Sequence, residues 1–297
     1  MASFDEMQRL FIAKELISLG YAIDKGQVLQ PAFAAVENDA SLWKYFNTIP
    51  TYSQVYASSG EEFFTVYSEL IDSLIPGDNA LDPIVAAKKR LANWGHRPPA
   101  WNVGHTGFMG QLSNAPSSSF EFDNKSAPES IFWGLWSNSL PVSGESSRFA
   151  SGDVSAKVFF SKALSFSPTP GDWYVSSALS LAYSSHSGLP WNPESPINWQ
   201  TTFGPNGKMQ RFLTALLAVS GMDIQFQSSA LFSADDQALI LQNAHKGLWP
   251  YYLDADKANT DVEFDKAGRI AVTITSRPGV PIIIAGNVLS AGQFLGE

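Results

Sequence analysis

The chain contains no cysteine, which excludes disulfide bridges, thiolate catalysis and zinc sites built on cysteine. This absence does not fix the compartment, because folds without bridges occur in reducing and oxidising surroundings alike. A run of about 18 apolar residues, the minimum for a membrane-spanning helix, is also missing. The first residues, Met1 to Glu6, are acidic rather than apolar, so no secretory signal is expected. These absences predict a protein that is cytoplasmic or leaves the cell by a non-classical route.

Charge is scarce as well. Charged residues make up 16% of the chain, against about 25% in typical soluble domains, and the formal net charge is -9. The densest basic cluster is only Lys88-Lys89-Arg90. Nucleic acid is therefore excluded as a partner, since phosphate neutralisation needs clustered basic residues. A weakly charged, serine-rich chain is more typical of adhesive or assembling proteins, and membrane lipid, a glycan and a second copy of the chain stay open as partners.

Residues 1–100 are predicted to be a helical region. Ser3 with Glu6 forms a capping-box pattern, and the helix that follows is expected to end at Gly20. Asp82 followed by Pro83 is an N-cap with proline at the first helical position, which predicts a helix to Trp94.

Residues 101–297 are predicted to be β-rich, with helices at 207–220 and 234–246. Two strands, residues 261–264 and 269–276, flank a four-residue turn that ends at Gly268, and residues 282–284 form a short apolar strand. The order of elements predicts an α+β fold, in which an N-terminal helical region packs on a mainly antiparallel β-sheet or sandwich with a two-helix insertion. A chain of 297 residues is long enough for two domains with a boundary near residue 100, and a single domain is the alternative.

The most regular alternation lies at residues 157–187. Two stretches with a period of two flank a turn rich in proline, which predicts a β-hairpin. One face is bulky and apolar and the other is small and rich in serine. A membrane-inserting hairpin needs about 9–11 residues per strand with such a pattern, and an ordinary sandwich shows it too. The residues assigned to a membrane or assembly face are Phe160, Leu164, Phe166, Trp173, Val175, Leu179 and Leu181.

A second candidate is the loop at residues 94–108, which holds two of the four histidines. Imidazole is a common general base near neutral pH, so His96 and His105 are the candidate catalytic residues. Arg97 is the candidate anion clamp. The alternative is a packed loop whose histidines only bind backbone groups.

Tryptophan is abundant, with nine residues in the chain, and four of them lie in turn-rich segments. Aromatic rings in such positions suit ligand or sugar stacking and are equally common in a core. The predicted ligand-binding residues are Trp94, Trp101, Trp191 and Trp199. No metal site and no cofactor are predicted, because no H-E-x-x-H, glycine-rich phosphate loop or complete calcium loop is present.

These observations favour a non-enzymatic binding or assembly protein, with membrane activity of the 157–187 hairpin as its sharpest form. A hydrolase or lyase that uses the histidine loop and a glycan-binding module are the two alternatives. No resemblance to a known family supports any of the three.

Overall fold

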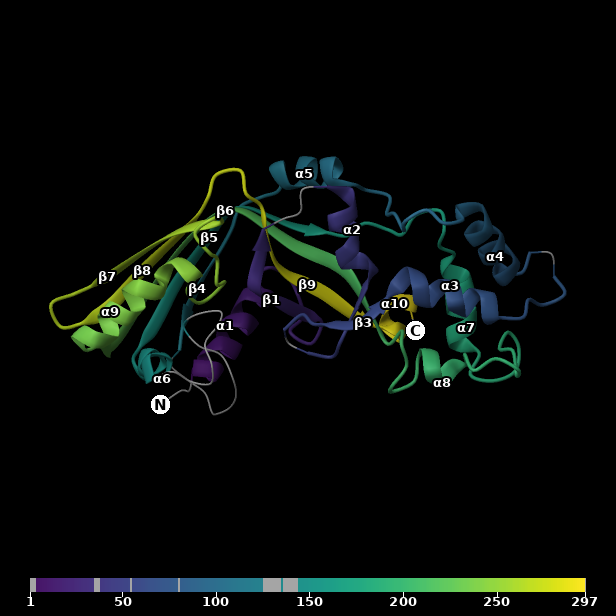
Figure 1. Cartoon of the computed structure of the whole chain (residues 1–297), viewed down its shortest axis with the longest axis horizontal. Helices are drawn as coiled ribbons and strands as arrows, with labels where there is room; N and C mark the ends of the chain where they lie inside the picture. The colour runs from purple at the N-terminus through teal and green to yellow at the C-terminus, as the bar shows by residue number, and fades with distance from the viewer. Residues whose placement is uncertain are drawn as a thin grey trace. The chain divides into compact units, whose positions relative to one another are not determined.

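The computed structural model of the chain describes residues 4–34, 38–53, 55–79, 81–124, 135 and 144–296. Over these residues it has ten α-helices and a mainly antiparallel sheet of seven strands (Figure 1), which confirms the predicted α+β class. The chain divides into two compact units that interleave in sequence. Unit 1 gathers Met1–Ala35, Gly110–Ser165 and Leu216–Ala285; unit 2 gathers Val36–Met109, Phe166–Ala215 and Gly286–Glu297. Residue 100 lies inside one segment of unit 2.

Unit 1 carries most of the sheet. Its helices are α1 (Phe4–Ser18), α6 (Gly144–Ser151) and α9 (Ala234–Asn243), the last followed by the 3-10 turn Ala244–Lys246. Its strands are β1 (Gly26–Ala34), β4 (Ser118–Asp123), β7 (Ala258–Phe264) and β8 (Arg269–Ser276), with most of β5 (Val154–Phe166), most of β6 (Arg211–Leu231) and the first part of β9 (Ile282–Ser290).

Unit 2 is mainly helical. Its helices are α2 (Asp39–Asn47), α3 (Phe63–Ser73), α4 (Pro83–Trp94), the first part of α5 (His105–Ser113), α7 (Ser176–Ser184), α8 (Trp199–Thr202) and α10 (Ala291–Leu295). A two-stranded ladder, β2 (Thr48–Pro50) with β3 (Ser58–Glu62), completes it, together with the first residues of β6 and the last of β9.

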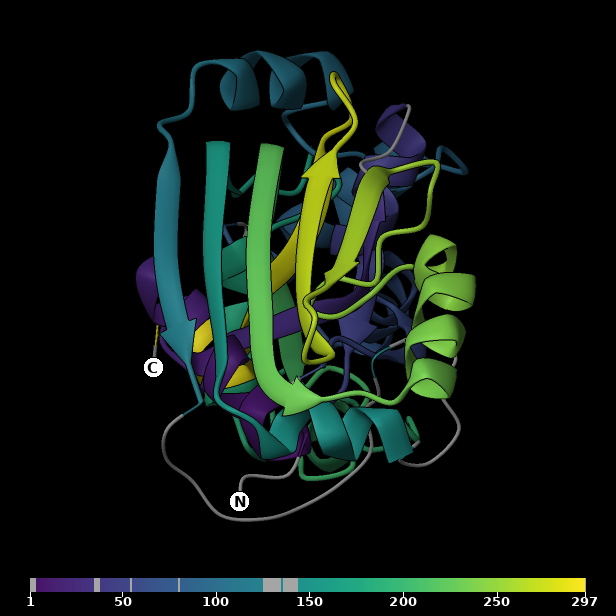
Figure 2. The same cartoon turned by 90° about the vertical axis from the view of Figure 1, so that its left-hand side faces the viewer.

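The strand order of the sheet is β1-β9-β6-β5-β4, and β8 pairs with both β6 and β7. Figure 2 shows β4, β5, β6, β8 and β7 side by side, with no described helix over the face turned to the viewer. Burial alternates strictly along β4 and β8, where Phe120, Phe122, Val272 and Ile274 point to the core. A half-solvated antiparallel sheet produces this pattern.

The core of unit 1 is built around Phe11 of α1. Its ring centroid lies 5.5 Å from those of Phe120 and Phe122, 4.9 Å from Trp249 and 6.0 Å from Tyr251. These contacts are tilted or edge-to-face, the arrangement that aromatic quadrupoles favour. Aromatic packing of this kind fixes α1 on the inner face of the sheet.

One ionisable group is fully buried in this core. Glu15 of α1 has no exposed surface, and its Oε1 accepts a 2.6 Å hydrogen bond from the Tyr251 hydroxyl. The second carboxyl oxygen, Oε2, has no hydrogen-bond partner among the described residues. Burial raises the pKa of Glu15 to about 8, and the bond from Tyr251 offsets this only in part. The side chain is therefore mostly protonated at neutral pH.

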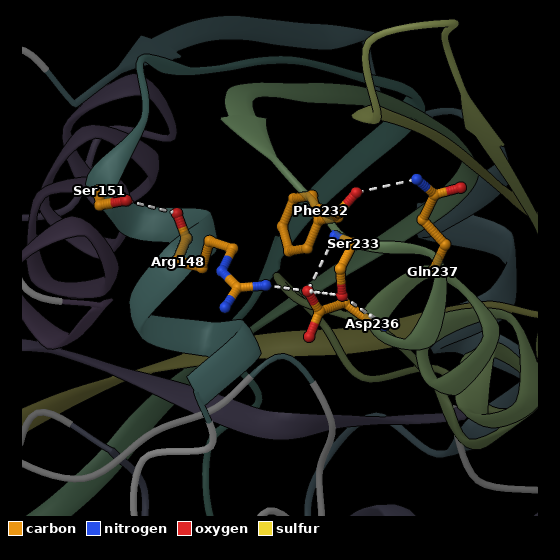
Figure 3. A network of polar contacts seen from close by, with 6 residues as sticks. All are labelled: Arg148, Ser151, Phe232, Ser233, Asp236 and Gln237. Carbon is orange, nitrogen blue, oxygen red and sulfur yellow. Dashed lines mark hydrogen bonds and ion pairs between the residues drawn. The ribbon is translucent and has the colours of Figure 1, made fainter.

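Helices α6 and α9 are joined by a polar network (Figure 3). The guanidinium of Arg148 donates to the Asp236 carboxylate, which also accepts from the Ser233 backbone N–H at 2.9 Å. Ser233 and Asp236 form the reciprocal capping box that begins α9. The predicted helix at 234–246 is thus confirmed as α9 and its 3-10 extension.

Other local signals are confirmed too. The Asp82 side chain accepts from the N–H of Ile84 at 2.6 Å, and α4 runs from Pro83 to Trp94 as predicted. Strands β7 and β8 form the predicted C-terminal hairpin. Ser3 lies outside the described residues. The region 1–100 is less purely helical than predicted, because β1, β2 and β3 lie within it.

The predicted hairpin at 157–187 is wrong in its second half. Its first strand is β5, which pairs antiparallel with β4, but residues 176–184 form helix α7. Ala178, Leu179 and Ala182 are the buried positions of α7, and this i, i+1, i+4 spacing is one helical face. Small residues at alternate positions of this segment also fit the period of two of a strand. The sequence pattern therefore did not distinguish a strand from a helix.

The predicted helix at 207–220 is also wrong, and with it the two-helix insertion. Residues 211–231 form the long strand β6. The segment 215–219 is buried at every position without alternation. A continuous apolar run of this length is equally typical of a strand buried on both faces and of a buried helix, so periodicity alone does not separate them.

Candidate ligand-binding site

An aromatic cluster fills the centre of unit 2, with Trp173 at its middle. Trp173 is completely buried, and its indole N–H donates to the carbonyl of Ala100 at 2.9 Å. Its ring centroid lies 5.5 Å from Phe63, 5.6 Å from Tyr67 and 5.8 Å from Trp101. The cluster joins α3 to the segment that leads into α7, so it sets the position of the residues around it.

A cavity of about 540 Å³ lies beside this cluster, within unit 2. Its volume falls in the range of about 300–1,000 Å³ that is typical of small-molecule sites. Aromatic residues form much of the wall, and serine and threonine residues line it in between. The aromatic lining residues are Phe46, Phe63, Trp101, Tyr174, Phe212 and Phe294, and the hydroxyl-bearing ones are Thr48, Ser167, Thr169, Ser176, Ser180 and Thr214.

Arg211, the first residue of β6, is the charged residue of this lining. Its Nε is buried and has no hydrogen-bond partner among the described residues. The guanidinium carbon lies 4.3 Å from the centroid of the Tyr52 ring, a cation–π contact with a side chain that is 82% exposed. None of the lining residues is acidic. The positive charge of Arg211 is therefore not neutralised inside the cavity.

The hydroxyl of Tyr174 is the second buried polar group in the lining residues that has no partner in the part of the chain that the structure describes. Burial, and to a lesser extent the neighbouring Tyr67, raise the pKa of Tyr174 well above its usual value. The phenol therefore stays neutral and keeps its proton for donation. Arg90 donates to the Tyr174 carbonyl at 3.3 Å and helps to fix this residue in place.

The neighbouring Tyr67 is fully engaged, in contrast to Tyr174. Its hydroxyl accepts a 2.9 Å hydrogen bond from the N–H of Val175, and burial raises its pKa to about 12. Tyr67 thus holds the start of α7, on which Ser176 and Ser180 face the cavity one turn apart. Among the described residues, neither Arg211 Nε nor the Tyr174 hydroxyl has such a hydrogen-bond partner.

The candidate catalytic residues of the histidine loop lie outside the cavity lining, although Trp101 of the same loop belongs to it. His96 and Arg97 are exposed, and Arg97 covers the Trp94 ring at 4.1 Å while its Nε donates to the Trp94 carbonyl at 2.9 Å. His105 begins α5, and its backbone N–H donates to Asp39 at 2.6 Å. None of these residues lines the cavity. Catalysis by this loop stays a prediction.

One of the four predicted ligand-binding tryptophans, Trp101, lines the cavity. Trp191 is buried and donates to the carbonyl of Ser185. Trp199 begins α8, donates to the carbonyl of Tyr183 at 2.7 Å and stacks on His186 with 4.5 Å between ring centroids. Trp94, like the other two, lies outside the lining.

The residues assigned to a membrane face are distributed over both units. Phe160, Phe166, Trp173 and Leu179 are at most 1% exposed. Leu164, Val175 and Leu181 are half-buried. The hairpin that would present them to lipid is not formed, since α7 replaces its second strand. Membrane insertion stays a prediction without that geometric basis.

A larger hollow, about 710 Å³, lies on the outer sheet face of unit 1. Its cationic side chain, Arg269, already pairs with Asp265 at 2.6 Å, so it offers no free donor comparable to Arg211. No group of three or more acidic or histidine side chains suited to a metal ion occurs among the described residues. The described helices are all too short or too polar to cross a membrane.

The chain was compared with protein-family models, curated proteins and solved structures, and no match was found. The site is therefore interpreted from its own geometry. Sequence reasoning missed Arg211, Tyr174 and the hydroxyl groups around them. The one signal for Arg211 was a single basic residue directly before the apolar run Phe212 to Val219.

Proposed function

We propose that unit 2 binds a small organic molecule with an aromatic or other apolar body in the cavity lined by Trp101, Tyr174 and Arg211. The observation that carries this proposal is an aromatic-walled cavity whose lining includes Arg211 and Tyr174, two residues with a buried polar atom that has no hydrogen-bond partner among the described residues. Buried polar groups in folded proteins are almost always hydrogen-bonded to protein or to bound water, and in this proposal the ligand supplies the partner.

The lining favours binding over catalysis. It contains serine and threonine hydroxyls, but no histidine, aspartate, glutamate or lysine accompanies them. A hydroxyl nucleophile needs a neighbouring base for activation, and this lining supplies none. The proposal therefore keeps the interpretation of the chain as a non-enzymatic binding protein and places the ligand in unit 2.

We expect the neutral dye N-phenyl-1-naphthylamine to bind with a rise in fluorescence, because the dye is quenched in water and emits in apolar sites. Ser180→Phe should weaken this binding at least about tenfold, since the added ring occupies the cavity. Ser177→Phe is the matched control, because Ser177 lies on the same helix but is exposed and outside the lining. Dye titration of the three proteins measures the effect.

Two results would contradict the proposal. One is that the dye does not bind the folded wild-type protein. The other is that Ser180→Phe, like Ser177→Phe, binds the dye as tightly as the wild type does. Circular dichroism of each variant shows whether the fold is kept before binding is compared.

A further inference from the structure

We infer that the ligand of this cavity carries a single carboxylate, which pairs with the Arg211 guanidinium and accepts a hydrogen bond from the Tyr174 hydroxyl. This inference rests on the proposed binding function and deepens it by naming the ligand class. The ligand is an aryl or other apolar carboxylate, with its charged end at the start of β6 and its body along the aromatic wall.

The charge of the occupant follows from the charge of the site. Arg211 carries the positive charge of a guanidinium, and its side chain is partly buried with the Nε atom enclosed. Burial of a charge is costly unless an opposite charge or hydrogen bonds compensate it. Arg211 has neither from the described residues, apart from the ring of Tyr52. An anionic group is thus the complementary ligand for this position.

The number of charges favours a carboxylate over a phosphate ester. Arg211 is the single cation of the lining, and Tyr174 contributes a neutral donor because its pKa is raised. A phosphate monoester carries about −1.5 to −2 charges at pH 7 and would leave part of that charge buried without a partner. A carboxylate brings one negative charge and accepts well from the fork of a guanidinium.

The remaining wall determines the body of the ligand. Phe46, Phe63 and Trp101 present rings, and Phe212 stacks on Phe294 with 4.2 Å between ring centroids. Flat aromatic bodies pack well against such rings in offset or edge-to-face geometry. The hydroxyls of Ser176 and Ser180 leave room for one polar substituent on that body.

The test compares 1-naphthoate with its neutral isostere 1-naphthamide by calorimetry on the full chain. We expect the wild type to bind naphthoate at least about tenfold more tightly, as charge-assisted hydrogen bonds require. Arg211→Met should abolish this preference, Arg211→Lys should keep part of it, and Arg97→Met, at an exposed arginine outside the cavity, should keep all of it.

The outcomes of this test distinguish the carboxylate inference from the proposed binding function on which it rests. If naphthamide binds the wild type as tightly as naphthoate does, or if 1-naphthyl phosphate binds more tightly than both, the carboxylate assignment is overturned and the binding function stands. If the neutral dye and both naphthalene compounds all fail to bind, the binding function and the inference fall together. The wild-type ratio decides the matter even if Arg211→Met does not fold.

Discussion

Glu15→Gln raises the free energy of unfolding by about 3 kcal/mol at pH 7. Glu15 is buried with a pKa of about 8, against 4.5 for the free group, so folding favours its protonated form. Its contribution is fully present below pH 4.5 and is lost as the pH rises toward 8, at about 1.4 kcal/mol per pH unit. Glutamine has the shape of the protonated acid and never ionises. Urea denaturation across the pH range measures the difference.

The pH profile distinguishes this mechanism from general stabilisation. At pH 4 the variant and the wild type should unfold at nearly the same urea concentration, and by pH 9 they should differ by about 5 kcal/mol. Glu263→Gln is the control, because Glu263 is an exposed residue of the same unit. A constant difference between the Glu15→Gln variant and the wild type at all pH values would contradict the buried, protonated state of Glu15.

Trp173→Ala lowers the free energy of unfolding by about 3–5 kcal/mol, the cost of truncating a large buried side chain. Trp173 is completely buried, contacts Phe63, Tyr67 and Trp101, and satisfies the carbonyl of Ala100. The same change removes the support of the cavity wall, so binding of the neutral dye should be lost as well. Chemical denaturation and dye titration on one preparation measure both effects.

Trp94→Ala is the matched control for this prediction. The Trp94 ring is half-exposed and its main packing partner is Arg97, so its removal should cost only about 1 kcal/mol and leave dye binding intact. Equal destabilisation by the two changes would contradict the central position given to Trp173.

The parts of the fold that the sequence predicted are those with local signals. Asp82 with Pro83 and Ser233 with Asp236 sit beside the helices that they begin, and the turn at Gly268 lies between the strands that it joins. Helix α5 had no such signal. Its first N–H is capped by Asp39, a residue remote in sequence, so no local pattern marks its start.

The second strand of the predicted hairpin and the helix predicted at 207–220 were wrong because their sequences are ambiguous. Residues 176–184 alternate small and large side chains, and residues 215–219 are uniformly apolar, so each fits a strand and a helix alike. What decides between them is packing. One face of α7 is buried in unit 2, whereas most of β6 lies in the sheet of unit 1, with β5 on one side and β9 and β8 on the other.

The candidate site was predictable only in part. Trp101 was selected because tryptophan in a turn-rich segment suits ligand stacking, and it does line the cavity. Arg211 and Tyr174 are identified as candidate site residues only because each has a buried polar atom without a hydrogen-bond partner among the described residues. Burial and hydrogen bonding are properties of the folded chain and cannot be read from the sequence. Tyr174 lies within the predicted hairpin at 157–187, and Arg211 lies within the helix predicted at 207–220.

The most direct test of the account is a titration of ¹⁵N-labelled protein with 1-naphthoate, observed at the arginine Nε–H resonances. Arg211→Lys removes one resonance and so assigns it. We predict that the Arg211 resonance moves downfield in proportion to occupancy, because the Nε–H has no partner among the described residues and the guanidinium gains an anionic one. Naphthamide should shift it far less. If naphthoate binds while the Arg211 resonance stays in place, the ligand lies elsewhere and the account is contradicted.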